Sequence, residues 1–321
     1  MRTPTHHNQG FVLVTVLWMI AILTVIVLGF GFRAMLERRI AWYELDQAQA
    51  QAMARGAVNR ALMELENKKS IDAFYQQAGY TGLDQHWATP VNLLDEAEYF
   101  DLAQDSDFDE ESCTFTITDC ERWISINDAP RDLLEALELF DFTTIDDLMD
   151  TRETKDRFQS TRLLSPDEVF GLEGGESIDE DLWYGTEDAA GIRSKLTLYG
   201  SARDGRININ TASHKVLSLI PKLSESTLET IMLYRNGSDE VPNTPDDRSF
   251  TSIRALRSHL STSFEAFAPI QKYCKTDSQW FKITTHATRR QGKINAYCTV
   301  IVEIQRNDLK IRQWKEGLVA Q

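Results

Sequence analysis

The feature that most constrains this chain is an apolar run close to its start. Residues 11–32 read FVLVTVLWMIAILTVIVLGFGF, twenty-two residues without an ionisable side chain. As an α-helix rising ~1.5 Å per residue, this segment is roughly 33 Å long, enough to cross a bilayer core of about 30 Å. It passes directly into Arg33 and a polar segment, without the small-residue cleavage site that follows the apolar core of a secretory signal peptide. The sequence therefore predicts one membrane-spanning helix.

Charge is distributed unevenly about this helix. Arg2 is the only lysine or arginine before it, and the positive-inside rule then places the N-terminus in the cytoplasm and the bulk of the chain across the membrane. The whole chain has 34 basic and 49 acidic side chains, a formal net charge of −15. Because nucleic acids and anionic lipid headgroups bind basic surfaces, this excess of acid argues against both as partners.

A short polar leader precedes the apolar run and ends in Gly10. The order of leader, Gly10–Phe11 junction, apolar helix and polar helical continuation resembles the class III leader of type IV pilins and of the pseudopilins of type II secretion. The resemblance implies that a prepilin peptidase cuts after Gly10 and methylates the new N-terminal residue, Phe11. Most family members carry a glutamate as the fifth mature residue, whereas this chain has Thr15. Among pseudopilins, lack of this glutamate is characteristic of the K-type minor subunit.

Beyond the span, the chain has a helical segment, then strands that flank a block of short helices. Small and apolar residues recur at helical spacing up to about Lys69, and they comprise Ala50, Ala54, Ala57, Ala61 and Leu65. An acidic connector occupies residues 84–112. Strand-like stretches occupy 113–119, 122–127, 279–289, 293–306 and 309–314, with a hairpin turn at Arg290-Gln-Gly292. This pattern predicts an α+β fold in which a long pilin-like helix packs on an antiparallel sheet that is interrupted by a large helical insertion.

The insertion is internally duplicated. The segment ISINDA at 124–129 matches ININTA at 207–212 with an offset of 83 residues. Downstream, residues 164–170 match residues 250–256 with an offset of 86. Asn127 and Asn210 occupy equivalent positions, and asparagine is a preferred helix N-cap, so both are predicted to cap helices.

The second copy carries the most specific resemblance. Residues 205–235, GRININTASHKVLSLIPKLSESTLETIMLYR, resemble the signature segment of the K-type minor pseudopilin of the bacterial type II secretion system, and residues 122–137 resemble its weaker first copy. The resemblance runs from Gly10 to about Trp314. It implies a tip subunit without enzymatic activity, which forms a complex with I- and J-type minor pseudopilins to initiate and cap the periplasmic pseudopilus during protein export across the outer membrane. The prepilin peptidase and the inner-membrane secretion platform are the other implied partners.

The expected organisation follows from these features. The chain is anchored once in the inner membrane, with its N-terminus in the cytoplasm and its bulk in the periplasm. The predicted divisions are a leader at 1–10, a transmembrane helix at 11–32, a pilin-like helix and first strands at 33–127, an inserted helical domain at 128–275 with units at about 128–192 and 210–275, and closing strands at 276–321.

A membrane-anchored binding module is the alternative interpretation. The ININTA segment also resembles helix-hairpin-helix modules, in which backbone amides of a glycine-containing hairpin hold a DNA phosphate at helix N-termini. Here residues 219–226 contain no glycine and place Glu225 where the phosphate would approach. Such a module would bind DNA or an exported protein. The net negative charge of the chain argues against nucleic acid, so no nucleic-acid partner is expected.

Acidic side chains of the insertion are candidate calcium ligands. K-type members tend to carry an Asp-Trp-x-Asp-x-Asp run in the first unit, and this chain has only a partial match there, with Lys155 at its last position. A second acidic stretch begins at Glu173, and carboxylate oxygens are the ligands that calcium prefers. The candidate ligands are Asp150, Glu153, Glu176, Asp179 and Asp181. No cofactor is expected to be required, and calcium is the one candidate.

Neither enzyme motifs nor a zinc site are visible. The sequence has no GxSxG, Walker A or HExxH motif, and its cysteines include no C-x2-C pair. In the periplasm the four cysteines, Cys113, Cys120, Cys274 and Cys298, would form up to two disulfides with three connectivities. Cys113 and Cys120 would lie roughly 23 Å apart in one straight strand, although a turn would bring them together. Cys274–Cys298 is the preferred bridge, because it would tie the exit of the insertion to the sheet.

Overall fold

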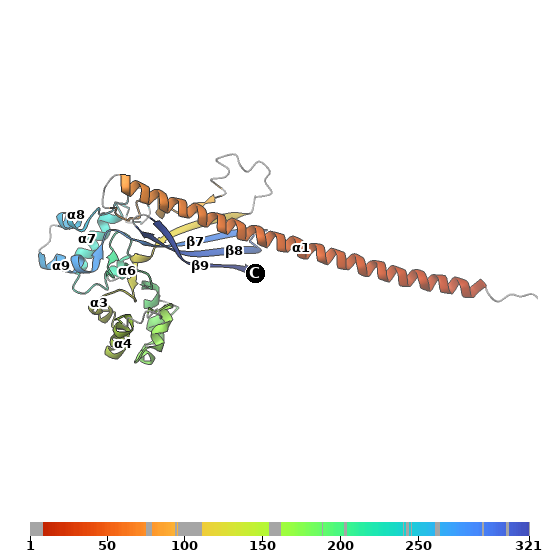
Figure 1. The fold of residues 1–321 in the computed structure, drawn as a ribbon, viewed down its shortest axis with the longest axis horizontal. Coiled ribbons are helices and arrows are strands. Elements are labelled where there is room, and N and C mark those ends of the chain that lie inside the picture. Colours follow the sequence, from red (N-terminus) through yellow and green to blue (C-terminus); the bar gives the residue numbers. More distant parts are fainter. Residues whose placement is uncertain are drawn as a thin grey trace, which may run out of the picture.

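The computed structural model describes residues 9–74, 79–93, 95, 111–153, 162–187, 189–201, 204–239, 241, 244, 246–260, 264–290, 292–305 and 308–320. Its first element, α1 (Gln9–Phe74), is one continuous helix of 66 residues. The N-terminal half of α1 projects far from the folded part, and the C-terminal half lies along it (Figure 1). The apolar run and the polar helical segment that follows it are therefore a single element.

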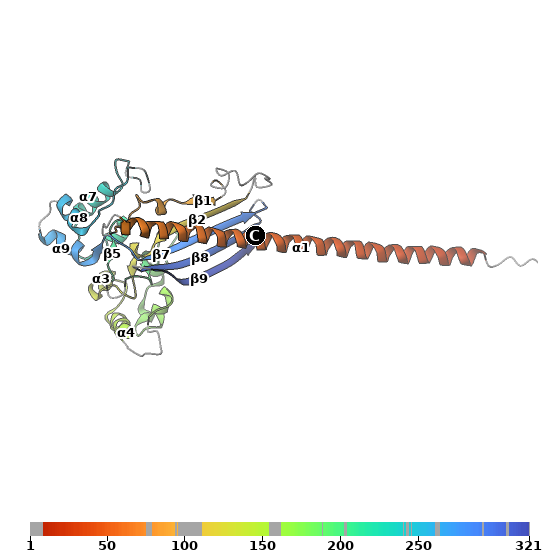
Figure 2. The ribbon, with the colours of Figure 1, turned by 45° about the horizontal axis from the view of Figure 1, so that its top comes forward.

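The C-terminal half of α1 packs on a five-stranded sheet, as Figure 2 shows. The sheet has the order β1-β2-β7-β8-β9, and every neighbouring pair is antiparallel. Its strands are β1 (Val91–Asn92), β2 (Ser112–Asp119), β7 (Trp280–Arg289), β8 (Ile294–Gln305) and β9 (Asp308–Ala320). The predicted long helix on an antiparallel sheet is confirmed. Two details differ: an edge strand lies within the predicted acidic connector, and β9 continues six residues past Trp314 because it remains paired with β8.

The core between α1 and the sheet follows from the two periodicities of the sequence. Four alanines at helical spacing on α1 are buried with Leu65, and they let the helix approach the strands closely: Ala50, Ala54, Ala57 and Ala61. Alternate residues of β2, β7 and β8 are buried beneath it, as in Phe281 and Ile283. Trp87, from the 3₁₀ helix η1 (His86–Ala88), closes one end of this core with its ring edge-on to Phe281, at 5.3 Å between centroids.

The helical insertion forms a second hydrophobic core, separate from that beneath α1. Its first unit contains η2 (Cys120–Arg122), β3 (Ile124–Ser125), α3 (Arg131–Glu135), α4 (Phe142–Glu153), η3 (Pro166–Gly171), η4 (Gly175–Ser177), α5 (Glu180–Tyr184), η5 (Ile192–Lys195) and β4 (Leu196–Thr197). Its second unit contains β5 (Ile207–Asn208), α6 (His214–Leu217), α7 (Glu225–Arg235), α8 (Ile253–Leu260), α9 (Phe264–Tyr273) and β6 (Cys274–Lys275). The predicted strand at 122–127 is thus reduced to two residues of β3.

Each unit is closed by a short parallel pair of strands, β3 with β4 and β5 with β6.

The duplication extends to buried hydrogen bonds. Asn210 exchanges two bonds with the backbone of Phe250, donating to its carbonyl at 2.9 Å and accepting from its amide at 2.9 Å. Asn127 accepts from the amide of Leu163 and donates to its carbonyl, both at 3.0 Å. We call these two residues the asparagine clasps.

The clasps correct two expectations. Neither asparagine caps a helix, because Pro130 and Ser213 occupy the N-cap positions of α3 and α6. The side-chain amide of each clasp instead pairs with a peptide group about forty residues further on, which is a long-range contact that local sequence does not reveal. Because Asn127 bonds to Leu163 and Asn210 bonds to Phe250, Leu163 and Phe250 are equivalent residues of the two units. The predicted alignment paired Leu164 with Phe250, so the offset in the second part of the repeat is one residue larger than predicted.

Replacing Asn210 with alanine is expected to lower the free energy of unfolding by about 2–4 kcal/mol. The reason is that the amide and the carbonyl of Phe250 would be left buried without their partner. Denaturant unfolding of the detergent-solubilised chain measures this loss. Asn59→Ala, on the exposed face of α1, is the matched control. Equal stability of the two variants would show that the clasp contributes nothing.

Candidate assembly surface

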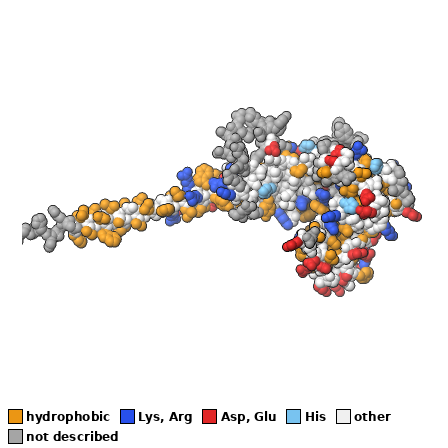
Figure 3. Space-filling view, turned by 180° about the vertical axis from the view of Figure 1, so that it is seen from behind, with side chains coloured by type: hydrophobic (Ala, Val, Ile, Leu, Met, Phe, Trp, Pro, Cys, Tyr) orange, Lys and Arg blue, Asp and Glu red, His pale blue; other side chains and the backbone are white. Residues whose placement is uncertain are grey.

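The N-terminal half of α1 is a wholly exposed apolar surface. Its large hydrophobic side chains between Phe11 and Phe32 are 48% to 74% exposed. Figure 3 shows this half as a projecting rod covered with hydrophobic side chains. Its length and composition are sufficient to cross a membrane, and none of its most apolar window is buried in the folded part. A continuous apolar surface of this size requires lipid or other apolar helices around it.

Thr15 occupies the position where the pilin resemblance leads one to expect a carboxylate. Its hydroxyl lies 2.9 Å from the carbonyl oxygen of Val12 and 3.2 Å from that of Phe11, so it donates its hydrogen bond within its own helix. A neutral hydroxyl satisfied in this way needs no partner from a neighbouring subunit, whereas an ionised carboxylate in hydrocarbon would.

A second apolar surface lies on β9, the last strand of the sheet. Ile311, Trp314 and Leu318 are 47%, 39% and 37% exposed. They pair in register with Val302, Val300 and Ala296, whose side chains are buried beneath α1. The three residues therefore lie on the helix-facing side of the sheet, but beyond the area that α1 covers. We call them the β9 row.

The β9 row is tied to α1 by one bidentate ion pair. Arg55 donates from Nε and Nη2 to the two carboxylate oxygens of Glu316, at 2.8 and 2.7 Å. Trp314 Nε1 donates to the same carboxylate at 3.2 Å. These bonds lower the pKa of Glu316, so the carboxylate stays ionised. Since β9 ends the sheet, its outer backbone edge is paired with no other described strand, and such an edge is a ready site for another chain.

A buried polar network joins the sheet to the insertion. Asp119, at the end of β2, accepts three side-chain bonds, from Asn208 at 2.9 Å, Thr211 at 2.6 Å and Ser278 at 2.7 Å. The ammonium group of Lys275 lies 2.9 Å from the carboxylate of Glu121, and both side chains are almost fully buried.

The Glu121 carboxylate also binds the surrounding backbone. It accepts from the amides of Ser201 and Gln279, each at 2.7 Å. Burial raises the pKa of Glu121, and the charge of Lys275 acts against that rise. The network therefore fixes the orientation of the insertion on the sheet, and it depends on a charge pair rather than on apolar contact.

The predicted calcium ligands whose side chains the structure describes do not form a metal site. No group of three or more His, Cys, Asp or Glu residues within the described ranges could hold a metal ion. Asp179 instead caps α5, where its carboxylate accepts from the amides of Asp181 and Leu182. Asp150 lies on α4 and Glu176 in η4, while the side chain of Glu153 lies outside the described residues. Among the described side chains, those of Asp150, Glu176, Asp179 and Asp181 form no metal site, and calcium binding by the chain stays a prediction.

The cysteines also differ from expectation. All four are free and buried. Cys274 belongs to the core of the insertion and Cys298 to the core beneath α1, so the predicted Cys274–Cys298 bridge is not formed. Burial raises the pKa of Cys274 to about 12 and that of Cys113 to about 11, which leaves both as unreactive thiols at neutral pH.

The helix-hairpin-helix alternative gains nothing from the geometry. Glu225 lies in the first turn of α7, and His214 Nε2 is 3.0 Å from its carboxylate. The Ser224 side chain accepts from the amide of Thr227 and so caps the same helix. An anion approaching this N-terminus would meet a carboxylate and an amide that is already bound.

Sequence reasoning missed three of these features. The clasps, the Glu121–Lys275 pair and the β9 row all depend on contacts between residues far apart in the chain. The sequence offered one signal for the β9 row, because Leu309, Ile311, Trp314 and Leu318 are apolar and most of the other residues between 308 and 318 are charged. The buried pair had none, since Glu121 and Lys275 resemble surface residues in the sequence.

The fold defines a class of protein: a long apolar N-terminal helix whose second half packs on an antiparallel sheet is the pilin-like architecture. The structure is similar to a chain of the solved GspK–GspI–GspJ complex of the type II secretion system from enterotoxigenic Escherichia coli, with a TM-score of 0.53 and 13% sequence identity. The likeness covers 86% of this chain and 99% of that chain, and it establishes a pseudopilin fold. No protein-family model and no curated protein sequence matches the chain.

Proposed function

We propose that the chain is the K-type minor pseudopilin of a type II secretion system. In this proposal, it is anchored once in the inner membrane with its N-terminus in the cytoplasm and its bulk in the periplasm. A prepilin peptidase cuts after Gly10 and methylates Phe11, and the mature chain joins the pseudopilus at the secretion platform. It forms a complex with I- and J-type minor pseudopilins that initiates and caps the filament. No catalytic step is assigned to it.

The observation that carries the proposal is the extent of the structural likeness. The aligned 86% of the chain is too large a share to omit the helical insertion, so the likeness includes more than the helix and sheet. The similar structure is described as a complex that contains GspK, GspI and GspJ, which supports I- and J-type partners for this chain. Thr15 supports the K-type assignment independently, through the absence of the usual glutamate.

The position of the insertion supports a place at the tip. Its helices lie at the end of the molecule opposite the apolar half of α1 (Figure 1). In a filament built by stacking such helices along an axis, the next subunit would have to occupy the space above this end. An insertion at this end would hinder the addition of a further subunit, and this supports the proposed capping role.

The host strain offers the direct test of the proposed function. Deleting the chain should reduce secretion of type II substrates and the number of pseudopili, and expression of the full chain should restore both. An alternative role as a DNA or cargo receptor predicts normal pseudopili in the deletion strain. Normal pseudopili together with normal secretion would contradict the proposal.

The β9 row is the surface that we assign to partner binding. Trp314→Asp is expected to weaken the complex with the I- and J-type subunits by about 30- to 1000-fold, the range for an exposed aromatic anchor at the centre of an interface. The control is Tyr297→Ser, because Tyr297 is exposed to a similar degree but points from the opposite face of the sheet. Pull-down titration measures both variants, after thermal unfolding has verified their folding. Unchanged affinity of folded Trp314→Asp would rule out this surface.

A further inference from the structure

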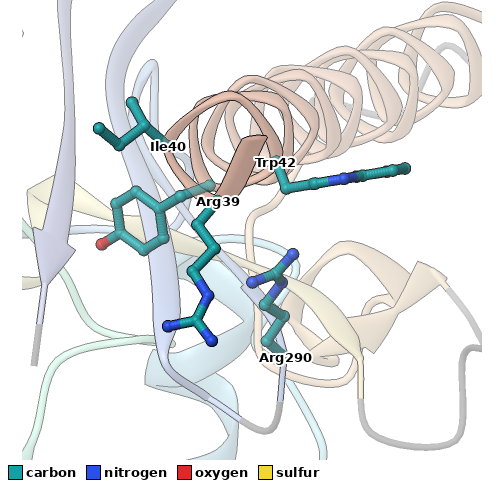
Figure 4. A pocket seen from close by; sticks show the side chains of 5 residues that line it. Arg39, Ile40, Trp42 and Arg290 are labelled. Atoms are coloured by element: carbon teal, nitrogen blue, oxygen red, sulfur yellow. The ribbon is translucent and has the colours of Figure 1, made fainter. Parts of the chain in front are cut away.

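A pocket lies where α1 meets the turn between β7 and β8, beside the apolar half of the helix. It has a volume of about 520 Å³ and is lined by Arg39, Ile40, Trp42, Tyr43 and Arg290. Figure 4 shows the side chains of Arg39 and Arg290 extending into the same space from two different elements, the helix and the turn. We propose that this pocket binds the phosphate of a phospholipid headgroup, in the leaflet that faces the folded part of the chain.

The depth of the pocket fits this ligand. Arg39 follows Phe32 by seven residues, roughly 10 Å along the helix, and the headgroup layer extends about 5–8 Å beyond each side of the hydrocarbon core. Helical side chains lean toward the N-terminus of their helix, which here is the direction of the membrane. A long arginine side chain can therefore reach back to the phosphate layer, as snorkelling arginines do.

The chemistry of the lining fits as well. Trp42, Tyr43 and Ile40 are partly or largely exposed, and tryptophan and tyrosine are the residues enriched at membrane interfaces. Two guanidinium groups facing one cavity suit a phosphate, which arginine binds through paired N–H donors. Arg290 is already paired with Asp46, which orients it, whereas Arg39 has no ion-pair partner among the described residues.

Local charge supports the assignment although the whole chain is acidic. Between residues 33 and 46 the helix carries Arg33, Arg38 and Arg39 against Glu37, Glu44 and Asp46, so the excess of positive charge at this end comes from the turn that contains Arg290. Lys293 lies exposed in the same turn as Arg290. The net charge of −15 therefore describes the molecule as a whole and not this end of it, and the exclusion of lipid headgroups holds only for the rest of the surface.

The consequence is that the folded part is held against the membrane surface through both α1 and the β7–β8 turn. This inference rests on the membrane anchoring within the proposed function, and not on the role in secretion. Resistance of the chain to alkaline carbonate extraction from membranes tests the anchoring separately. Extraction by carbonate would contradict the membrane anchoring, whereas failure of the lipid experiment below would contradict only the lipid-binding role of the pocket.

The test is native mass spectrometry of the full chain released from nanodiscs that contain phosphatidylethanolamine and phosphatidylglycerol. The wild-type chain should retain bound phospholipid. The fraction of chains with bound lipid should fall roughly fivefold for each arginine removed, first in Arg39→Gln and then in the double variant Arg39→Gln with Arg290→Gln. Arg38→Gln is the matched control, because it removes the same charge at the same depth without lining the pocket. Arg39 is exposed on a helix, so the single variant keeps the test valid if the double variant misfolds.

Further arms separate the alternatives. A large excess of inorganic phosphate should leave the bound lipid in place, and displacement by free phosphate would overturn a lipid source. Equal lipid loss in Arg39→Gln and Arg38→Gln would reduce the effect to general surface charge and overturn the pocket. Retention of lipid by Arg39→Gln and by the double variant would also overturn the pocket as a lipid site. Occupation of the pocket by a partner helix, in membranes that still contain the lipid, would overturn it as well.

Discussion

Replacing Lys275 with methionine is expected to lower the free energy of unfolding by about 3–5 kcal/mol at neutral pH, because the change leaves the Glu121 carboxylate buried without a counter-charge. Lys275 Nζ lies 2.9 Å from that carboxylate, and the two side chains are almost completely shielded from water. The remaining partners of Glu121, the amides of Ser201 and Gln279 and the Ser201 hydroxyl, donate hydrogen bonds but carry no charge. Denaturant unfolding of the detergent-solubilised chain measures the loss.

The loss should depend on pH in a defined direction. Burial raises the folded-state pKa of Glu121, so the folded chain binds this proton more tightly than the unfolded chain does. The contribution of Glu121 to the free energy of unfolding is therefore greatest below its pKa in the unfolded chain. It falls as the pH rises through its pKa in the folded chain. Without Lys275 the folded pKa rises further, so Lys275→Met should be markedly less destabilising at about pH 5 than at about pH 8.

The double variant provides the control. Glu121→Gln combined with Lys275→Met removes both charges. The single carbonyl oxygen of the glutamine can still accept from the Ser201 amide, but its NH2 group cannot accept from the Gln279 amide, which donates to the other carboxylate oxygen in the wild-type chain. The double variant should regain part of the lost stability and lose the pH dependence, because no buried charge is left without a counter-charge. Equal stability of Lys275→Met at the two pH values would show that Glu121 is not the group responsible.

Replacing Gly10 with valine is expected to leave the leader attached and to abolish incorporation of the chain into pseudopili. The leader carries polar residues and Arg2, and these must stay in the cytoplasm or be drawn into hydrocarbon when the helix leaves the membrane. An arginine at the centre of a bilayer costs about 2.5–3.5 kcal/mol even on the insertion scale that gives the lowest values. Uncleaved chains should therefore accumulate as anchored monomers.

Mass spectrometry of the purified chain reads this outcome directly. The wild-type chain should begin at an N-methylated Phe11, and the Gly10→Val chain should begin at its original N-terminus. His7→Ala, in the leader but away from the junction, is the matched control and should be processed normally. A strain without the prepilin peptidase should reproduce the Gly10→Val result. Normal cleavage of the valine variant would place the processing site elsewhere.

Local patterns in the sequence predicted the architecture well. The apolar run at 11–32 and the alanine stripe beyond it require a helix with two different environments, and α1 has an exposed half and a packed half. Alternation in 279–289 and 293–306 required a sheet with one buried face, and β7 and β8 form the predicted hairpin. These features were predictable because each depends on the period of neighbouring residues.

What the sequence did not predict depends on tertiary contact. Asn127 and Asn210 have the local signature of caps, yet their amides bond to peptide groups about forty residues away. Cys274 lies at the predicted exit of the insertion and Cys298 in a predicted strand of the sheet, but the two are packed into different cores. The acids from Asp150 to Asp181 are close in sequence, and helix capping and separate elements keep them from forming one metal site within the described residues.

The central claim, that this chain joins I- and J-type subunits at the tip of a pseudopilus, is tested most directly by reconstitution of that complex. The chain, purified with the I- and J-type pseudopilins from the same organism, should elute in size-exclusion chromatography as one species that contains all three proteins. Its mass by light scattering should equal the sum of the subunits. Separate elution of this chain at concentrations where the I- and J-type subunits associate with each other would contradict the account.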